Sequence, residues 1–202
     1  MKRQPAVCRR ACCLFVLCVP ALLTGCAAAV VGAGAAAGAT GVAASQDRRT
    51  AGTMLDDELI EDKALDAVYH DQELWNQSHL NITSYNNVVL LTGETPTPEL
   101  RARAEKIVLG IPKVRQVHNE ITISAPSSML SRSSDSWITS KVKTSMLTND
   151  NVPATRIKVV TENGIVYLMG LVTRAEGDAA TDVARQVSGV QRVVKLFEYV
   201  KG

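Results

Sequence analysis

The chain has 202 residues, of which 46% are hydrophobic and 21% are charged, so it can form one ordinary domain or two small ones. Its formal net charge is +2, but Lys2, Arg3, Arg9 and Arg10 contribute four of the 22 basic residues. Without residues 1–25 the chain carries 18 Lys and Arg against 20 Asp and Glu, a formal charge of −2. This balance removes the support for a general nucleic-acid role.

The N-terminus has the layout of a secretory signal. The basic residues precede an apolar segment, 11–23, that is too short to span a bilayer. Leu23-Thr24-Gly25-Cys26 then resembles a bacterial lipobox, the alternative being an uncleaved anchor or a chance match. The resemblance implies removal of residues 1–25 and acylation of Cys26, with a diacylglycerol on the thiol and an acyl chain such as palmitate on the amine. Ala27, in place of an acidic residue, implies a lipid-anchored position on the periplasmic side of the outer membrane.

Cysteine usage fits this interpretation. Four of the five cysteines lie in the segment expected to be removed, and the fifth is the lipidation site. The mature chain is therefore predicted to have no disulfide, free thiol or cysteine metal site, although its compartment is oxidising.

Residues 26–53 begin with the lipidated cysteine and are rich in Ala, Gly and Val, with glycines that interrupt any helix. We interpret them as a flexible tether with a root-mean-square reach of about 30 Å. The alternative is an apolar segment that lies on the membrane.

The rest of the chain is an internal repeat. Residues 80–93 match residues 157–170 at an offset of 77, and the register resumes at 76 after one deletion. Each copy predicts helix, strand, tight turn, strand, helix and strand. Asn163-Gly164 is a strong signal for a two-residue hairpin, and Asn86-Asn87 is a weaker one. The resulting domains are 54–124 and 134–202, with a Ser-rich linker at 125–133.

The second helix of each copy has a start signal. Pro98 suits a first helical position behind Thr97, and Thr173 with Glu176 has capping-box spacing. Final strands are expected near 117–123 and 193–200. A crossover from the second strand through the helix to the third makes each small sheet mixed and gives an α+β fold.

The αββαβ repeat resembles the BON domain. A Gly closes the second strand of each copy, and the closest likeness lies in segments 137–139, 161–164 and 168–173. Asn119, at the usual Asn position of the third strand, is replaced by Lys195 in the second copy, which weakens any role assigned to that side chain. Two BON copies behind a lipobox are typical of outer-membrane lipoproteins that bind phospholipid and support envelope integrity, with a role at the division site as a further expectation.

The two first helices differ in charge. Residues 56–66 of the first copy hold six acidic residues and Lys63 alone, a surface that anionic lipid should repel. In the second copy we expect Ser134 to cap a helix with Asp135 in its first turn. Ile138, Val142, Ser145 and Met146 form its core stripe, which leaves Trp137 and Leu147 on the wet face.

An apolar pair edged by lysines is what an interfacial membrane contact needs. The predicted site for anionic, phosphatidylglycerol-like phospholipid consists of Trp137, Lys141, Lys143, Thr144, Leu147 and Thr148. The alternative for Trp137 is packing against the first domain.

No catalytic constellation is found. His70, His79 and His118 lack the spacing of a metal or triad site, and no Gly-rich loop precedes a strand-helix unit. We therefore expect no enzyme activity, cofactor, metal or small-molecule substrate. The second functional hypothesis is a periplasmic adaptor, in which the acidic first helix or a strand edge binds a basic partner of the envelope assembly machinery.

Overall fold

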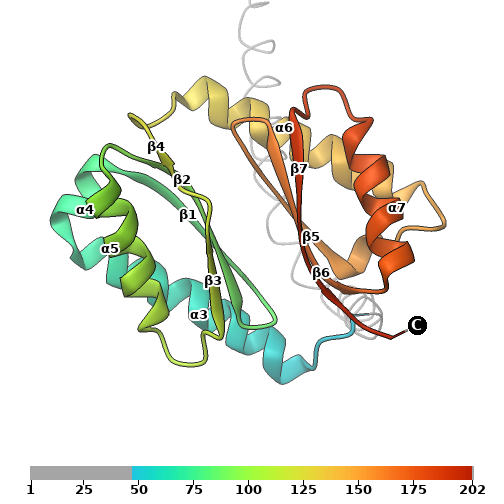
Figure 1. Cartoon of the computed structure of the whole chain (residues 1–202), viewed down its shortest axis with the longest axis horizontal. Coiled ribbons are helices and arrows are strands. Elements are labelled where there is room, and N and C mark those ends of the chain that lie inside the picture. Colours follow the sequence, from blue (N-terminus) through green and yellow to red (C-terminus); the bar gives the residue numbers. More distant parts are fainter. Residues whose placement is uncertain (1–46, 202) are drawn as a thin grey trace, which may run out of the picture. The chain divides into compact units, whose positions relative to one another are not determined.

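The computed structural model describes residues 47–201, which carry the colours of the bar in Figure 1. The expected signal segment 1–25, Cys26 and residues 27–46 of the expected tether lie outside the described residues. No helix between residues 47 and 201 is long and apolar enough to cross a membrane.

The first copy forms a small mixed sheet covered by helices (Figure 1). Its strand β1 pairs antiparallel with β2, which pairs parallel with β3 and β4. Buried residues of α3 and α5, such as Ile60 and Ala104, pack against Val89 and Leu91 of β2. The elements are α3 (Ala51–His70), α4 (Gln72–Gln77), β1 (His79–Tyr85), β2 (Val88–Thr95), α5 (Pro98–Leu109), β3 (Gln116–Asn119) and β4 (Thr122–Ile123).

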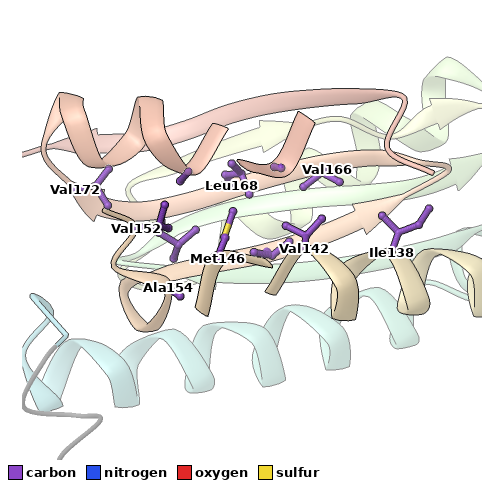
Figure 2. Close-up of a cluster of buried hydrophobic side chains, with 12 residues drawn as sticks. Ile138, Val142, Met146, Val152, Ala154, Val166, Leu168 and Val172 are labelled. Atoms are coloured by element: carbon purple, nitrogen blue, oxygen red, sulfur yellow. The ribbon is translucent and has the colours of Figure 1, made fainter. Parts of the chain in front are cut away.

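The second copy repeats this plan. Its strand β5 pairs antiparallel with β6, and β6 pairs parallel with β7. Figure 2 shows its core, where Val142 and Met146 of the first helix lie close to Val166 and Leu168 of the sheet. The elements are α6 (Met129–Leu147), the 3-10 turn η3 (Ala154–Arg156), β5 (Ile157–Glu162), β6 (Ile165–Val172), α7 (Arg174–Arg185) and β7 (Arg192–Tyr199). The predicted fold, two α+β copies with mixed sheets, is confirmed.

The predicted helix starts are also confirmed. Thr97 caps α5 through a bond from the backbone N–H of Leu100, with Pro98 in the first turn. Thr173 and Glu176 form a reciprocal capping box at the start of α7. These local bonds satisfy backbone N–H groups that have no partner inside the helix.

Both hairpin turns have the positive φ angles of a type I′ turn, 54° and 63° at Asn86 and Asn87, and 48° and 73° at Asn163 and Gly164. Each turn is held by an aspartate of the preceding first helix. Asp57 accepts the backbone N–H groups of Asn86 and Asn87 at 2.8 and 2.7 Å.

The predicted start of the second copy's first helix is wrong. Helix α6 begins at Met129 behind the N-cap Ser128, so Ser134 lies inside the helix and most of the expected linker is helical. Asp135 is buried instead of exposed in the first turn, because its carboxylate accepts the backbone N–H groups of Asn163 and Gly164. This tertiary contact leaves no local sequence signal.

The third strand of the first copy is interrupted. The expected strand 117–123 is split into β3 and β4, because the backbone N–H of Ile121 bonds to the side chain of Asn119 and the Ile121 side chain is buried. Helix α4 was not predicted from the sequence. It is capped by Asp71, which accepts the backbone N–H of Leu74 at 3.0 Å.

The sheet faces that carry no helices pack against each other. Tyr85, Val88 and Leu90 of the first copy form one buried cluster with Tyr167 and Met169 of the second. Both faces of β2 are therefore covered, and all eight of its residues are buried. Polar bonds surround this cluster, including Asn81 to Glu162 at 2.7 Å and Asn163 to Glu94 at 2.6 Å.

The described end of the expected tether is attached to the folded part. Helix α3 begins at Ala51, inside the range 26–53 that the sequence assigned to the tether. Arg49 pairs with Asp57 at 2.8 Å and lies 3.8 Å from the ring centre of Tyr85. Arg48 pairs with Glu176 of α7 at 2.7 Å. Residues 47–49 thus contact both copies.

Candidate functional site

Trp137 and Leu147 are each 67% exposed on α6. Ile138, Val142 and Met146 on the opposite side of the helix are buried in the core. The predicted division of this helix is therefore confirmed at these positions. Since two thirds of the Trp137 side chain is exposed, the alternative that it packs against the first domain is wrong.

An open groove of about 710 Å3 lies beside Trp137, between α6 and the end of α7. Four of the six predicted residues, Trp137, Lys141, Thr144 and Thr148, line it. Ser140, on the same face, also lines it, and Ser145, expected in the core stripe, is only half-buried and lines it too. The sequence did not predict the contributions of Asn149, Val183, Gln186, Val187 and Ser188. Most of these lie some 40 residues along the chain from the predicted residues, and periodicity within one helix cannot find them.

One wall of the groove depends on Gly189. This residue has a φ of 100°, and a Cβ there would lie 3.0 Å from the Cγ1 of Ile138. The close approach brings the backbone of Ser188 to the helix, where its carbonyl accepts a hydrogen bond from the Lys141 ammonium. The sequence analysis did not predict this contact, for which the glycine at position 189 is a local signal.

The two predicted lysines have different positions. Lys141 lines the groove, whereas the Lys143 ammonium donates to the carbonyl of Ile157 at 2.7 Å. Burial lowers the pKa of Lys143, and the nearby Lys158 lowers it further. Lys143 was expected at the border of the exposed face of α6. Its ammonium instead donates to backbone carbonyls of its own domain, so this expectation is not met.

The hydroxyl groups along the groove are satisfied by their own helix. Ser140 donates to the carbonyl of Ser136, Thr144 to that of Ser140 and Thr148 to that of Ser145, all within 3.0 Å. Covering these side chains with an apolar surface leaves no hydroxyl proton without an acceptor. Among residues 47–201, Lys141 is the only charged residue that lines the groove, and no acid does.

The corresponding place in the first copy is nearly closed. Leu59 and Lys63 of α3 occupy the positions of Trp137 and Lys141, but the hollow beside them is only about 90 Å3. Pro112 and Lys113 form its other wall, and Lys113 pairs with Asp56 at 2.7 Å. The open groove is therefore a property of the second copy.

Metal chemistry finds no support within residues 47–201, where no group of three or more His, Cys, Asp or Glu side chains could hold an ion. His70 Nδ1 lies 2.8 Å from the Asp66 carbonyl, and His79 Nδ1 lies 3.3 Å from Arg132. His70 thus contacts its own helix, and His79 contacts a residue of the second copy.

The fold and the doubled plan define a protein with two BON domains. The BON domain family matches residues 56–125 and 134–201, and the chain belongs to this family. It is similar to the outer membrane lipoprotein DolP of Haemophilus influenzae, with 41% identity over 88% of this chain and 90% of that protein. It is also similar to a 21 kDa hemolysin of Actinobacillus pleuropneumoniae, with 39% identity over 77% of this chain and 80% of the relative. The osmotically-inducible protein Y of Escherichia coli is 27% identical over 89% of this chain and 90% of its own length.

Proposed function

We propose that the protein is an outer-membrane lipoprotein whose second BON domain binds anionic phospholipid and thereby supports envelope integrity. The observation that carries the proposal is the exposed Trp137 beside an acid-free groove that holds Lys141. The location is supported by the lipobox ending at Cys26 and by the 41% identity to an outer membrane lipoprotein.

The apolar residues supply the larger part of the binding. Burying Trp137 and Leu147 in the interfacial region would contribute about 1.5 to 3 kcal/mol each. Both are two-thirds exposed, so most of this burial is still available to a membrane. Lys141 adds about 1 kcal/mol near an anionic surface.

The charge distribution favours the second domain over the first. Helix α3 presents Glu58, Asp62 and Asp66 to solvent, and these side chains would be repelled by anionic headgroups. The groove of the second domain presents a lysine and uncharged side chains. Because α3 is acidic and the groove of the second domain is not, we expect the second domain to face an anionic lipid surface.

The second domain would contact the membrane through few residues, so we expect its own affinity for lipid to be weak. Acylation at Cys26 would hold it near the bilayer at an effective concentration of about millimolar, which makes a weak contact sufficient. In this proposal the protein has two membrane contacts, a permanent one at Cys26 and a reversible one at α6.

Cosedimentation with vesicles tests the proposal. The chain from residue 47 onward should bind vesicles containing phosphatidylglycerol, and Trp137→Ala combined with Leu147→Ala should remove most of the bound fraction. Trp75→Ala is the control, because Trp75 is the other tryptophan of the chain, lies in the first domain and is 43% exposed. Undiminished binding of the double variant would contradict the proposal.

A further inference from the structure

The two first helices align without a gap, since α3 begins at Ala51 and α6 begins 78 residues later at Met129. Leu65 therefore corresponds to Lys143. In the second domain the Lys143 ammonium donates to the carbonyl of Ile157 on the edge strand β5. In the first domain Leu65 has no group that can make this bond.

In the first domain, the backbone carbonyl that corresponds to that of Ile157 belongs to Leu80, and it lacks a lysine donor among the described residues. Leu80 is the first-domain counterpart of Ile157, because each pairs with the glycine of the next strand, Gly93 or Gly170. Among residues 47–201, no side chain donates a hydrogen bond to the Leu80 carbonyl. In the described part of the chain, β1 pairs with β2 alone and is therefore an edge strand. Its outer side is therefore a place where a donor from another chain can bind.

A cavity of about 370 Å3 lies at this place. Its apolar lining comes from Leu65 and Val68 of α3, Leu74 and Trp75 of α4, and Leu80 and Ile82 of β1. Leu65 is 47% exposed and Trp75 is 43% exposed, so the cavity opens to solvent. The buried hydroxyl of Ser78, which also lines it, has no hydrogen-bond partner among the described residues.

The charges that α3 presents beside the cavity are negative, whereas Arg132 of α6 contacts His79, which also lines the cavity. With about 100° per residue, Glu58 and Asp62 lie on the same side of α3 as Leu65, and Lys63 lies on the other side. Neither acid forms an ion pair with a cation in residues 47–201. A ligand that brings an apolar chain and a positive charge would match both the lining and the surroundings.

We propose that this cavity of the first domain binds an extended protein segment that inserts a lysine flanked by apolar residues. The aliphatic stem of the lysine would lie between Leu65 and Trp75, and its ammonium would donate to the Leu80 carbonyl as Lys143 does to Ile157 within the second domain. The partner's lysine thus takes the place that the second domain fills with its own side chain. The site uses a different domain and the opposite charge preference from the lipid contact.

A peptide selection tests the proposal directly. Random eight-residue peptides displayed on phage are selected on the full chain in detergent micelles, and enriched peptides are then measured by fluorescence polarisation. We expect enrichment of peptides with a lysine between apolar residues. Replacing that lysine by norleucine should weaken binding at least about tenfold, the effect of one charge-assisted hydrogen bond. A selection without lysine enrichment would contradict the proposal.

Two variants of Leu65 give the matched comparison. Leu65→Lys should bring an ammonium to the Leu80 carbonyl, as Lys143 brings one to the Ile157 carbonyl, and should weaken the selected peptides at least about tenfold. Leu65→Met keeps an apolar chain of similar volume and should change binding less than about threefold. Peptide binding that is unchanged by Leu65→Lys would overturn the site. If Leu65→Lys instead altered vesicle cosedimentation, the cavity would be a membrane contact, whereas the α6 double variant reports on the lipid proposal alone.

Discussion

The carboxylate of Asp135, inside α6, accepts the backbone N–H of Asn163 at 2.9 Å. Its other oxygen accepts the N–H of Gly164 at 2.8 Å, so one buried side chain satisfies both residues of the hairpin turn. Asp57 makes the same two bonds in the first domain. Each helix therefore fixes the turn of its own sheet, and through it the register of the strands.

Asp135→Ala is expected to destabilise the second domain by about 2 to 4 kcal/mol, because two backbone N–H groups near the protein interior lose their acceptor. Urea unfolding followed by circular dichroism measures the loss. Ser136→Ala is the control, since Ser136 is exposed and donates only to a carbonyl of its own helix. Equal stability of the two variants would show that the turn does not depend on the carboxylate.

Gly189→Ala is expected to destabilise the protein by at least about 1 kcal/mol, because the added Cβ meets Ile138 and an L-residue is strained at this positive φ. The displaced backbone also removes the Ser188 carbonyl from Lys141. Thermal unfolding gives the stability change, and vesicle cosedimentation gives the effect on the groove. Gly52→Ala serves as the control, because a Cβ there meets no atom closer than 3.7 Å. A Gly189→Ala protein as stable as this control would contradict the packing argument.

Lys141 and Lys143 are expected to separate binding from stability. Lys141→Gln should weaken binding to phosphatidylglycerol vesicles about fivefold, which corresponds to about 1 kcal/mol, and should reduce the dependence of binding on salt. Lys143→Met should mainly lower the thermal midpoint, because it keeps an apolar stem but removes the donor to the Ile157 carbonyl. Cosedimentation at two salt concentrations and thermal unfolding distinguish the two effects. Equal losses of lipid binding in both variants would restore Lys143 to the membrane-facing site.

The stability of the folded protein is expected to depend on pH through Glu162. Burial raises its pKa, an effect that Glu94 and Asp135 reinforce and that the hydrogen bond from Asn81 opposes. The folded state therefore holds this proton more tightly than the unfolded chain does. The contribution of Glu162 to stability is largest below the unfolded pKa of about 4.5 and decreases as pH rises through the raised folded value.

Glu162→Gln removes this titration while keeping an oxygen for the Asn81 amide. We expect the variant to be more stable than the parent at pH 8 and to lose that advantage at pH 4, as measured by thermal midpoints. Asp150→Asn, at an exposed carboxylate, should show no such change. A stability difference that does not vary with pH would contradict the role of Glu162.

The predictions that held depend on local chemistry. The Asn163-Gly164 turn, the Thr97 cap and the Thr173 capping box each use residues within four positions of one another, so their bonds can be inferred from spacing. The exposed Trp137 followed from helical periodicity in the same way. Local patterns were also sufficient to predict the fold. The same order of helices and strands is indicated in both copies of the repeat, so each copy supports the prediction for the other.

The predictions that failed depend on distant partners. Asp135 was placed in a first turn because an acid after a serine is a common helix start, but its partners lie 28 and 29 residues further on. Lys143 was assigned to the wet face because a helix projection does not show that its long chain can reach the Ile157 carbonyl. The groove wall around Ser188 comes from the turn that follows α7 and could not be inferred from α6 alone.

The insertion of Trp137 into lipid is tested most directly by its own fluorescence. Trp75→Phe leaves Trp137 as the only tryptophan, since the chain has two. On addition of phosphatidylglycerol vesicles we predict a blue shift of the emission and quenching by brominated acyl chains, with no change for vesicles of neutral lipid alone. Binding of the protein to anionic vesicles without any shift or quenching of Trp137 would contradict the proposed contact.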